Sequence, residues 1–149
     1  MTNTNNFNGV AISKTELIKL LNKDLELEYA AAVQYINHAA VMTGAKYGSI
    51  IKELNIHANE EIAHAIVLAG QISYLGGNPA VDVAKVYTDK DNDKMLEQDL
   101  AGEEDAIRRY KERVKQAEEL EEYALSQQLR VILAQEQEHA MDLEEALGK

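Results

Sequence analysis

Two stretches of this chain, NEEIAHA at residues 59–65 and AQEQEHAMDLE at residues 134–144, each contain a glutamate followed three residues later by a histidine. A further glutamate lies 33 residues before the glutamate of each pair. The two sets are Glu28 with Glu61 and His64, and Glu103 with Glu136 and His139. The repeat indicates two copies of one helix pair, each offering two carboxylates and one imidazole.

Apolar residues recur at steps of three and four in four long stretches, which predicts four amphipathic helices. A capping box that begins at Ser13 predicts a first helix starting near Lys14, and we expect Gly44 to end it. We expect the second helix over residues 47–75, where a Gly-Gly-Asn-Pro sequence stops it.

Residues 76–93 have no clear period and predict a long crossover that returns the chain to the other end of a bundle. The second and third helices should then run parallel, with the third starting near Asp93. A hinge is expected around residues 118–123, although no Gly or Pro marks it. The predicted fold class is therefore all-α, with a four-helix bundle over residues 13–149.

Composition narrows the range of functions. The chain has 149 residues, a formal net charge of −11 and no cysteine. Thiolate metal sites and disulfides are excluded, and non-specific nucleic-acid binding is disfavoured because it requires a cationic surface. No apolar run is long enough for a membrane span. Residues 1–12, polar and Asn-rich, are expected to form a flexible N-terminal tail without signal-peptide features, and we expect a cytoplasmic protein.

All four glutamates of the repeat fall on the inward, apolar stripes of their helices. An ionised carboxylate in an apolar seam is unfavourable unless it is paired or binds a metal. Four at matched depth indicate a dinuclear cation centre, and the i, i+3 spacing places each Glu–His pair on one helix face. The neighbours Glu60 and Glu104 are the competing candidates. The six predicted ligands are Glu28, Glu61, His64, Glu103, Glu136 and His139, and mixed oxygen and nitrogen ligands suit Fe or Mn, with Zn also possible.

These motifs, with LELEYAAAVQYINHA (25–39) and DKMLEQDLAGEEDAI (93–107), resemble the ferritin-like superfamily and bacterioferritin most closely. The resemblance implies that the six residues bind two Fe ions per subunit and oxidise Fe(II) with O2 or H2O2. It also implies that Tyr35 lies beside the centre, as a hydrogen-bond donor to a bridging carboxylate or a one-electron donor, with Tyr110 as its pseudo-symmetric counterpart. A homodimer or larger homo-oligomer is expected.

Two positions depart from bacterioferritin. The methionine that ligates haem there is replaced by Ile62, so we expect no haem. The sequence ends at Lys149, without the further short helix of bacterioferritin, which weighs against a closed storage shell. His57 is interpreted as a core or surface histidine, with transient iron binding as the alternative, and His38 as structural.

The leading hypothesis is a di-iron carboxylate protein with ferroxidase-type oxidoreductase activity, acting in iron homeostasis and protection from oxidative stress. Two alternatives use the same residues. One is an iron-storage subunit or metal buffer, and the other is a manganese catalase-like or oxygenase activity.

Overall fold

The computed structural model describes residues 11–149, and most of the predicted tail, residues 1–12, lies outside them. Four long helices make up the described part, which contains no strand. They are α1 (Lys14–Val41), α2 (Gly48–Tyr74), α3 (Asn92–Glu119) and α4 (Tyr123–Leu147), with a short 3-10 helix η1 (Ala45–Tyr47) before α2. The all-α four-helix bundle predicted from the sequence is confirmed.

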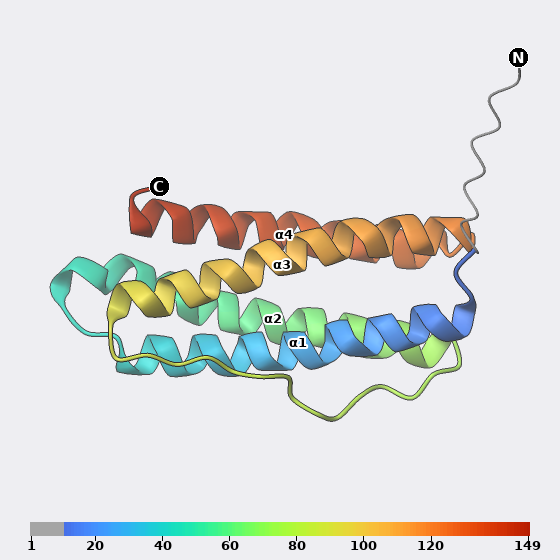
Figure 1. Ribbon diagram of the computed structural model, residues 1–149, viewed down its shortest axis with the longest axis horizontal. Coiled ribbons are helices and arrows are strands. Elements are labelled where there is room, and N and C mark those ends of the chain that lie inside the picture. Colours follow the sequence, from blue (N-terminus) through green and yellow to red (C-terminus); the bar gives the residue numbers. More distant parts are fainter. Residues whose placement is uncertain (1–10) are drawn as a thin grey trace, which may run out of the picture.

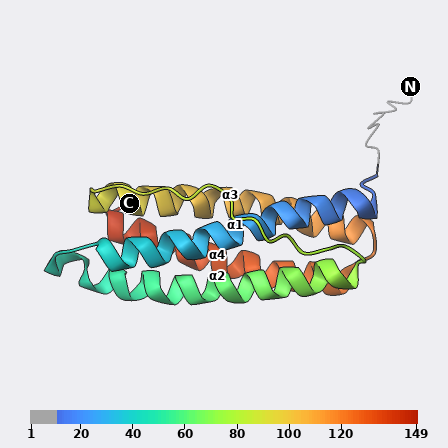
Figure 2. The same cartoon turned by 90° about the horizontal axis from the view of Figure 1, so that it is seen from below.

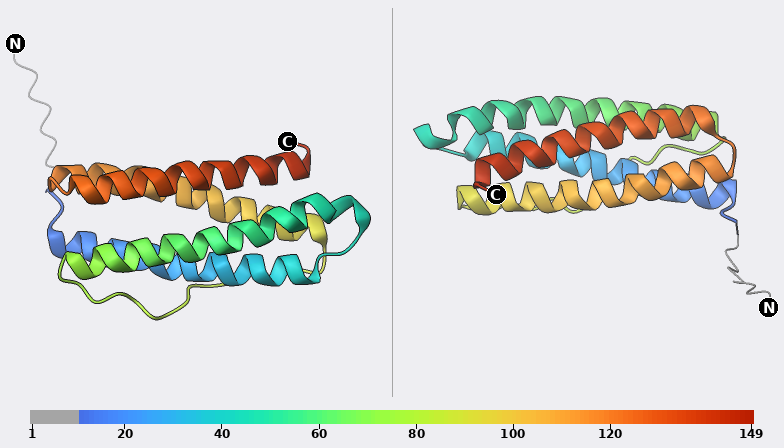
Figure 3. Two further views of the ribbon diagram at one scale, coloured as in Figure 1. Left: turned by 180° about the vertical axis from the view of Figure 1, so that it is seen from behind. Right: turned by 90° about the horizontal axis from the view of Figure 1, so that it is seen from above.

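The helices form two closely packed pairs, α1 with α2 and α3 with α4 (Figure 1). The segment between Tyr74 and Asn92 runs the length of the bundle beside α1, so that α2 and α3 point in the same direction, as predicted (Figure 2). Viewed from behind, α2 and α4 lie on the face opposite the crossover (Figure 3). The bundle therefore has two different long faces, one crossed by the connecting segment and one left open.

Hydrogen bonds tie the crossover to α1 in register. The Tyr29 hydroxyl donates to the Ala80 carbonyl over 3.0 Å, and the Ala84 amide donates to the Glu26 carbonyl over 3.1 Å. Further along, the Tyr87 amide donates to the side-chain oxygen of Gln34 over 2.9 Å. These bonds satisfy polar groups of an extended segment that would otherwise need water.

The observed helix ends show which capping signals in the sequence correctly predicted where a helix begins or ends. Ser13 accepts a hydrogen bond from the Glu16 amide and caps α1 as predicted. The predicted end at Gly44 is wrong by a few residues, because α1 stops at Val41 and Gly44 lies in the following turn with φ +106°. At the unmarked hinge, Glu121 adopts φ +59° and the Glu122 amide donates to the Ala117 carbonyl, which is a Schellman-type ending without glycine.

The core divides into two clusters of buried apolar side chains, one toward each end of the bundle. The Leu17, Leu21 and Leu25 stripe of α1 belongs to the first cluster, and Leu54 of α2 and Leu96 of α3 belong to the second. Between the clusters the helices bury polar side chains instead of apolar ones. This polar layer contains the candidate site.

Candidate metal centre

The structure brings all six predicted ligands together between the two helix pairs. Each pair contributes one glutamate from its first helix and a Glu–His pair from its second. Every one of these side chains is almost completely buried, with 1–3% of the residue exposed. The competing Glu104 is exposed, and Glu60 is only half-buried.

The six residues form two overlapping groups whose ligand atoms lie within 4.8 Å of one another. One group is Glu28, Glu61, His64 and Glu136, and the other is Glu61, Glu103, Glu136 and His139. Glu61 and Glu136 belong to both groups. A two-metal arrangement would therefore use these two as bridging carboxylates, with one glutamate and one histidine as terminal ligands on each side.

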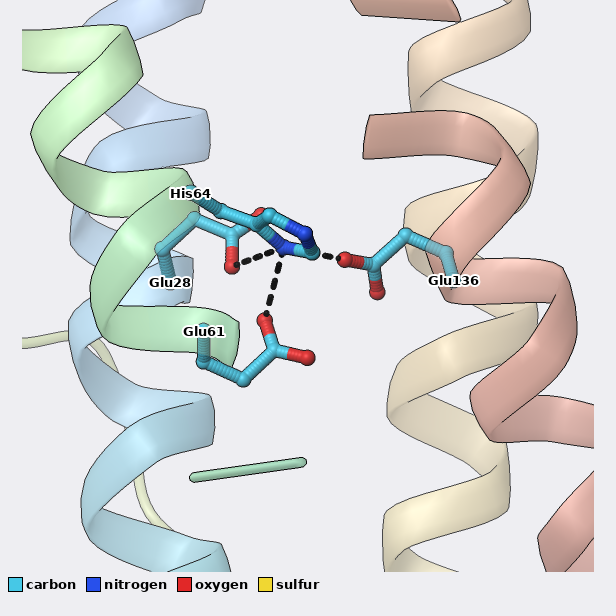
Figure 4. Close-up of side chains that lie close together, drawn as sticks. All are labelled: Glu28, Glu61, His64 and Glu136. Atoms are coloured by element: carbon cyan, nitrogen blue, oxygen red, sulfur yellow. Dashed lines mark ion pairs between the residues drawn. The ribbon is translucent and has the colours of Figure 1, made fainter. Parts of the chain in front are cut away.

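The first group shows how the ligand atoms converge (Figure 4). His64 Nδ1 lies 2.8 Å from Glu136 Oε1, 3.5 Å from Glu61 Oε2 and 3.6 Å from Glu28 Oε2. In the second group His139 Nδ1 lies 2.8 Å from Glu61 Oε1 and 3.3 Å from Glu103 Oε1. Both imidazoles present the same nitrogen to the carboxylates.

The opposite nitrogen of each ring is held by a partner outside the centre. His64 Nε2 contacts Gln135 Oε1 at 2.5 Å, and His139 Nε2 contacts Glu60 Oε2 at 3.0 Å. Since both partners are oxygen acceptors, each Nε2 carries a proton, and the lone pair of a neutral ring then lies on Nδ1. Partners of this kind orient metal-binding histidines and increase their basicity.

The hydrogen-bonding pattern tests whether these residues fit metal ions. Among the described residues, eight buried side-chain atoms have no hydrogen-bond partner, and six of them belong to the six ligands, one atom each. They are Glu28 Oε2, Glu61 Oε1, His64 Nδ1, Glu103 Oε2, Glu136 Oε1 and His139 Nδ1. Buried polar atoms are almost always satisfied in proteins. These six oxygen and nitrogen atoms face one another and make no well-aligned hydrogen bond, and the close contacts between them are ion pairs such as His64 Nδ1 with Glu136 Oε1 at 2.8 Å. Such a set of ligand atoms fits two cations.

The pKa values of these groups reflect burial and the repulsion between the neighbouring carboxylates. Burial, then the charges of Glu28, Glu136 and Glu103, raises the pKa of Glu61 well above its usual range. The pKa of Glu136 is raised well above its range for the same kind of reason, and burial raises the pKa of Glu103 to about 7. Burial opposes charge on His139, but the carboxylate of Glu61 prevails and raises its pKa to about 9. Four carboxylates would be neutralised by two divalent cations, which removes this repulsion.

A cavity of about 660 Å³ connects the centre to the face crossed by the connecting segment. Glu28, Glu61, Glu103 and Glu136 line its inner part, and Lys85 and Tyr87 of the crossover line it further out. The centre is thus accessible from the side of α1 and α3.

Comparison with known proteins identifies the family. The family model for the ferritin-like domain matches residues 18–149. The chain belongs to the ferritin-like family. This ferritin-like chain is 32% identical to a bacterioferritin of Brucella melitensis over 133 residues, which cover 89% of the chain and 83% of that protein.

Solved structures agree with this assignment. A ferritin-like di-iron carboxylate protein from Bacillus anthracis superposes with a TM-score of 0.87 at 33% identity, covering 91% of the chain and 99% of that protein. A dodecameric thioferritin from Bacteroides fragilis, described as bacterioferritin-related, superposes with a TM-score of 0.85 at 31% identity. That superposition covers 93% of the chain and 88% of that protein.

Two tyrosines bond the two glutamates that each belong to only one of the candidate ligand groups. Tyr35 of α1 donates to Glu103 of α3, and Tyr110 of α3 donates to Glu28 of α1. The sequence analysis expected Tyr35 to bond a bridging carboxylate. In the structure Tyr35 bonds Glu103, which belongs to one of the two candidate ligand groups, and its role beside a di-iron centre stays a prediction. The undecided Tyr110 proves to be the structural counterpart of Tyr35.

A further set of buried polar residues follows the same internal repeat and was not predicted from the sequence. Asp24 and Asp99 lie four residues before Glu28 and Glu103, and both are buried. Asp99 bonds Gln34 Nε2 at 2.8 Å and His38 Nδ1 at 2.9 Å. Asp24 bonds Arg109 at 2.6 Å and Arg113 at 2.7 Å, which occupy the positions of Gln34 and His38 in the second helix pair. The sequence signal that could have identified this set is an aspartate at matching positions on the inward faces of α1 and α3.

His38 is structural, in agreement with the sequence interpretation, because it links Asp99 to the Tyr87 carbonyl of the crossover. His57 is buried beside the centre, with its ring stacked on that of His139 at a centroid distance of 4.0 Å. Burial and the neighbouring His139 lower the pKa of His57 to about 4. None of the described helices is apolar enough over sufficient length to cross a membrane.

Proposed function

We propose that the chain is a di-iron protein that oxidises Fe(II) with O2 or H2O2. The observation that carries the proposal is the set of six buried ligand atoms, one from each of the six predicted residues, that face one another without a well-aligned hydrogen bond. Family membership supports iron, as does the similarity to a di-iron carboxylate protein from Bacillus anthracis. Two Fe(II) ions held side by side supply together the two electrons that reduce one O2 to H2O2, or one H2O2 to two water molecules, with uptake of two protons.

The residues of the chain would have separate tasks. Glu61 and Glu136 would help to hold both irons, because each belongs to both ligand groups. One iron would also be bound by Glu28 and His64, and the other by Glu103 and His139. The surrounding hydrogen bonds hold these side chains before iron arrives, so that little reorganisation accompanies binding. Bonding of each Nε2 keeps the metal-facing Nδ1 free of a proton once the cations replace the cluster's protons.

The proposal is tested by single-turnover oxidation. Protein freed of metal and loaded anaerobically with two Fe(II) per chain should develop ferric near-UV absorbance within seconds of mixing with O2 or H2O2. The rate should exceed that of the same Fe(II) in buffer, and comparison of the two oxidants identifies the one that is used. Oxidation no faster than in buffer, with either oxidant, would contradict the proposal. Manganese loading followed by an H2O2 disproportionation assay separates the catalase-like alternative.

The two tyrosines give a second prediction. Tyr35→Phe and Tyr110→Phe each remove one hydrogen bond to a terminal carboxylate and leave the ring in place. Because the two bonds are symmetry-related, we expect both variants to oxidise Fe(II) more slowly by a similar factor of about ten. Stopped-flow absorbance measures the rates. A loss confined to Tyr35→Phe would contradict this shared positioning role and identify Tyr35 as an electron donor.

We further propose that the protein acts as a homo-oligomer and that storage of the oxidised iron is a second function. Val33 and Ile36 of α1 and Ile62 and Ile66 of α2 are exposed apolar side chains on one helix pair. Exposed apolar patches often mark contacts between subunits. The Bacteroides fragilis neighbour is dodecameric, which favours a large assembly. Light scattering of the purified protein should give a mass of about twelve chains, and a dimer would contradict a storage shell.

A further inference from the structure

The two histidines of the centre are held by different kinds of side chain. Glu60 and Gln135 occupy matching places in the internal repeat, each directly before the glutamate of a Glu–His pair. Each contacts the histidine of the other helix pair: Glu60 Oε2 lies 3.0 Å from His139 Nε2, and Gln135 Oε1 lies 2.5 Å from His64 Nε2. The repeat is therefore broken at this point, because one imidazole faces a carboxylate and the other a neutral amide.

The buried aspartates beside the centre differ in the same direction. Two arginines bond the aspartate one turn before Glu28, whereas an amide and an imidazole bond the aspartate one turn before Glu103. The first set is Asp24 with Arg109 and Arg113, and the second is Asp99 with Gln34 and His38. Asp24 thus faces two positive charges, on side chains that are only 12% and 7% exposed, and Asp99 faces one at most. More negative charge therefore remains beside Glu103 than beside Glu28.

We propose that the two metal positions are unequal, and that Glu60 makes the position formed by Glu103 and His139 bind the first divalent cation. We call it the His139 position, and we call its counterpart, formed by Glu28 and His64, the His64 position. The inference rests on the di-metal centre of the proposed function, but the order of binding is independent of whether the iron is oxidised.

The reason is the charge behind the imidazole. A carboxylate that accepts the Nε2 proton draws it away from the ring and increases the electron density at Nδ1, which faces the metal position. Such partners strengthen metal binding by histidine, and their loss typically lowers the affinity about 10- to 100-fold. Gln135 orients His64 in the same way but carries no charge. The Glu60 side chain is 30% exposed and that of His139 is 2% exposed, so the carboxylate keeps some hydration while its charge acts on a buried ring.

Unequal positions would regulate the oxidation itself. At a low supply of Fe(II), most iron would occupy the His139 position alone. A single Fe(II) does not supply the two electrons that O2 or H2O2 takes up at the centre. Rapid oxidation would begin only when the His64 position also fills, so the centre would respond to a rise in Fe(II) beyond the amount that fills the first position.

Variants with one impaired position test the inequality. Glu28→Gln removes the terminal carboxylate of the His64 position, and Glu103→Gln removes that of the His139 position. Each should keep one tight site for Mn(II), which is the probe because it does not oxidise under anaerobic conditions. Electron paramagnetic resonance of the free ion gives the Kd. We expect Glu28→Gln to bind Mn(II) about tenfold more tightly than Glu103→Gln, and equal Kd values would overturn the inequality.

Replacing the carboxylate by an amide tests the role of Glu60. In the Glu28→Gln background, Glu60→Gln keeps the side-chain shape and the hydrogen bond to His139 but removes the charge, and it should raise the Kd about tenfold. The control in the same background is Glu138→Gln, which removes an exposed charge next to His139 in the sequence and should leave the Kd unchanged. An unchanged Kd in the Glu60 variant, or an equal rise in the control, would overturn this role.

The reverse substitution tests the same role by a gain in affinity. In the Glu103→Gln background, Gln135→Glu gives His64 a carboxylate partner and should lower the Kd of the His64 position about tenfold. Misfolding does not tighten binding, so a gain supports the proposal whatever the other variants do to stability. A Kd that does not fall would overturn it.

Stopped-flow oxidation at increasing Fe(II) tests the regulation. In the natural protein, the share of iron oxidised in the rapid phase should be smaller at one Fe(II) per chain than at two, and Glu60→Gln should reduce that difference. Equal shares at both ratios in the natural protein would overturn the regulation. Absence of tight Mn(II) binding by the natural protein would instead count against the di-metal centre, and ordered binding without oxidation would count against the proposed function alone.

Discussion

Glu136→Gln is expected to abolish the rapid oxidation of Fe(II). Glu136 belongs to both ligand groups, so its loss removes an oxygen from each metal position at once. Gln has nearly the same shape but only one oxygen and no charge, and it cannot balance two cations. We expect the single-turnover rate to fall by about 100-fold or more, and the bound Fe(II) to fall below two per chain. Stopped-flow absorbance and elemental analysis measure the two effects. The same reasoning applies to Glu61→Gln.

A control on the same helix separates ligation from general charge loss. Glu138 lies two residues further along α4 and is exposed, so Glu138→Gln should retain the normal rate. The ion-free Glu136→Gln protein should also be more stable than the natural one near pH 8. The reason is that burial and neighbouring carboxylates make the charge at position 136 unfavourable. Normal oxidation kinetics in Glu136→Gln would rule out the proposed centre.

The ion-free protein is expected to lose stability as the pH rises from about 6.5 to 9. A carboxyl group whose pKa is raised by folding stabilises the folded state at low pH, and the contribution disappears as the pH rises through the folded pKa. Burial raises the pKa of Glu103 from 4.5 to about 7. His139 acts in the same direction at higher pH, because its folded pKa of about 9 exceeds the usual 6.5. Both groups therefore stabilise the folded state only at pH values low enough for them to stay protonated in it. His57 acts in the opposite direction between about pH 4 and 6.5, because its folded pKa of about 4 lies below the usual 6.5. The net loss of stability is therefore expected mainly above pH 6.5.

The size of the effect follows from the pKa shifts of three residues. One unit of pKa corresponds to about 1.4 kcal/mol, and the opposite shifts of Glu103 and His57 largely cancel below pH 6.5. The shift of His139 from 6.5 to about 9 represents on the order of 3 kcal/mol between pH 6.5 and 9, which for a chain of this length is a fall in Tm of roughly 5–10 °C. Thermal unfolding of chelator-treated protein, followed by circular dichroism at pH 5, 7 and 9, measures it.

Metal binding should reverse this loss of stability with rising pH. Divalent cations replace the shared protons, and their binding strengthens as the ligands lose those protons. The Tm of protein saturated with Mn(II) should therefore exceed that of ion-free protein by a margin that grows with pH. An ion-free protein that is equally stable at pH 5 and 8, and unaffected by metal, would show that the six residues form ordinary buried ion pairs.

Local sequence signals were sufficient for most of the fold. The steps of three and four identify four helices because each apolar stripe covers one helix face, whatever that face contacts. The length of the crossover predicts that α2 and α3 run parallel, since a short turn would have joined antiparallel neighbours. Helix ends were harder to predict. Gly44 lies in a turn beyond the end of α1. Glu121 adopts a left-handed backbone conformation, which a glutamate in the sequence does not predict.

The sequence by itself determined which residues could be ligands and on which helix face each one lies. The i, i+3 spacing of Glu61 with His64 and of Glu136 with His139 depends on one helix alone, as does the inward position of Glu28 and Glu103. Only the tertiary structure decided how the tasks divide. The packing of one helix pair against the other places Glu61 and Glu136 in both ligand groups. The same packing brings Tyr35 to Glu103 and His57 to Asp142. Helical periodicity is a short-range property of the chain, whereas contacts between helices depend on their separation and rotation in the folded bundle.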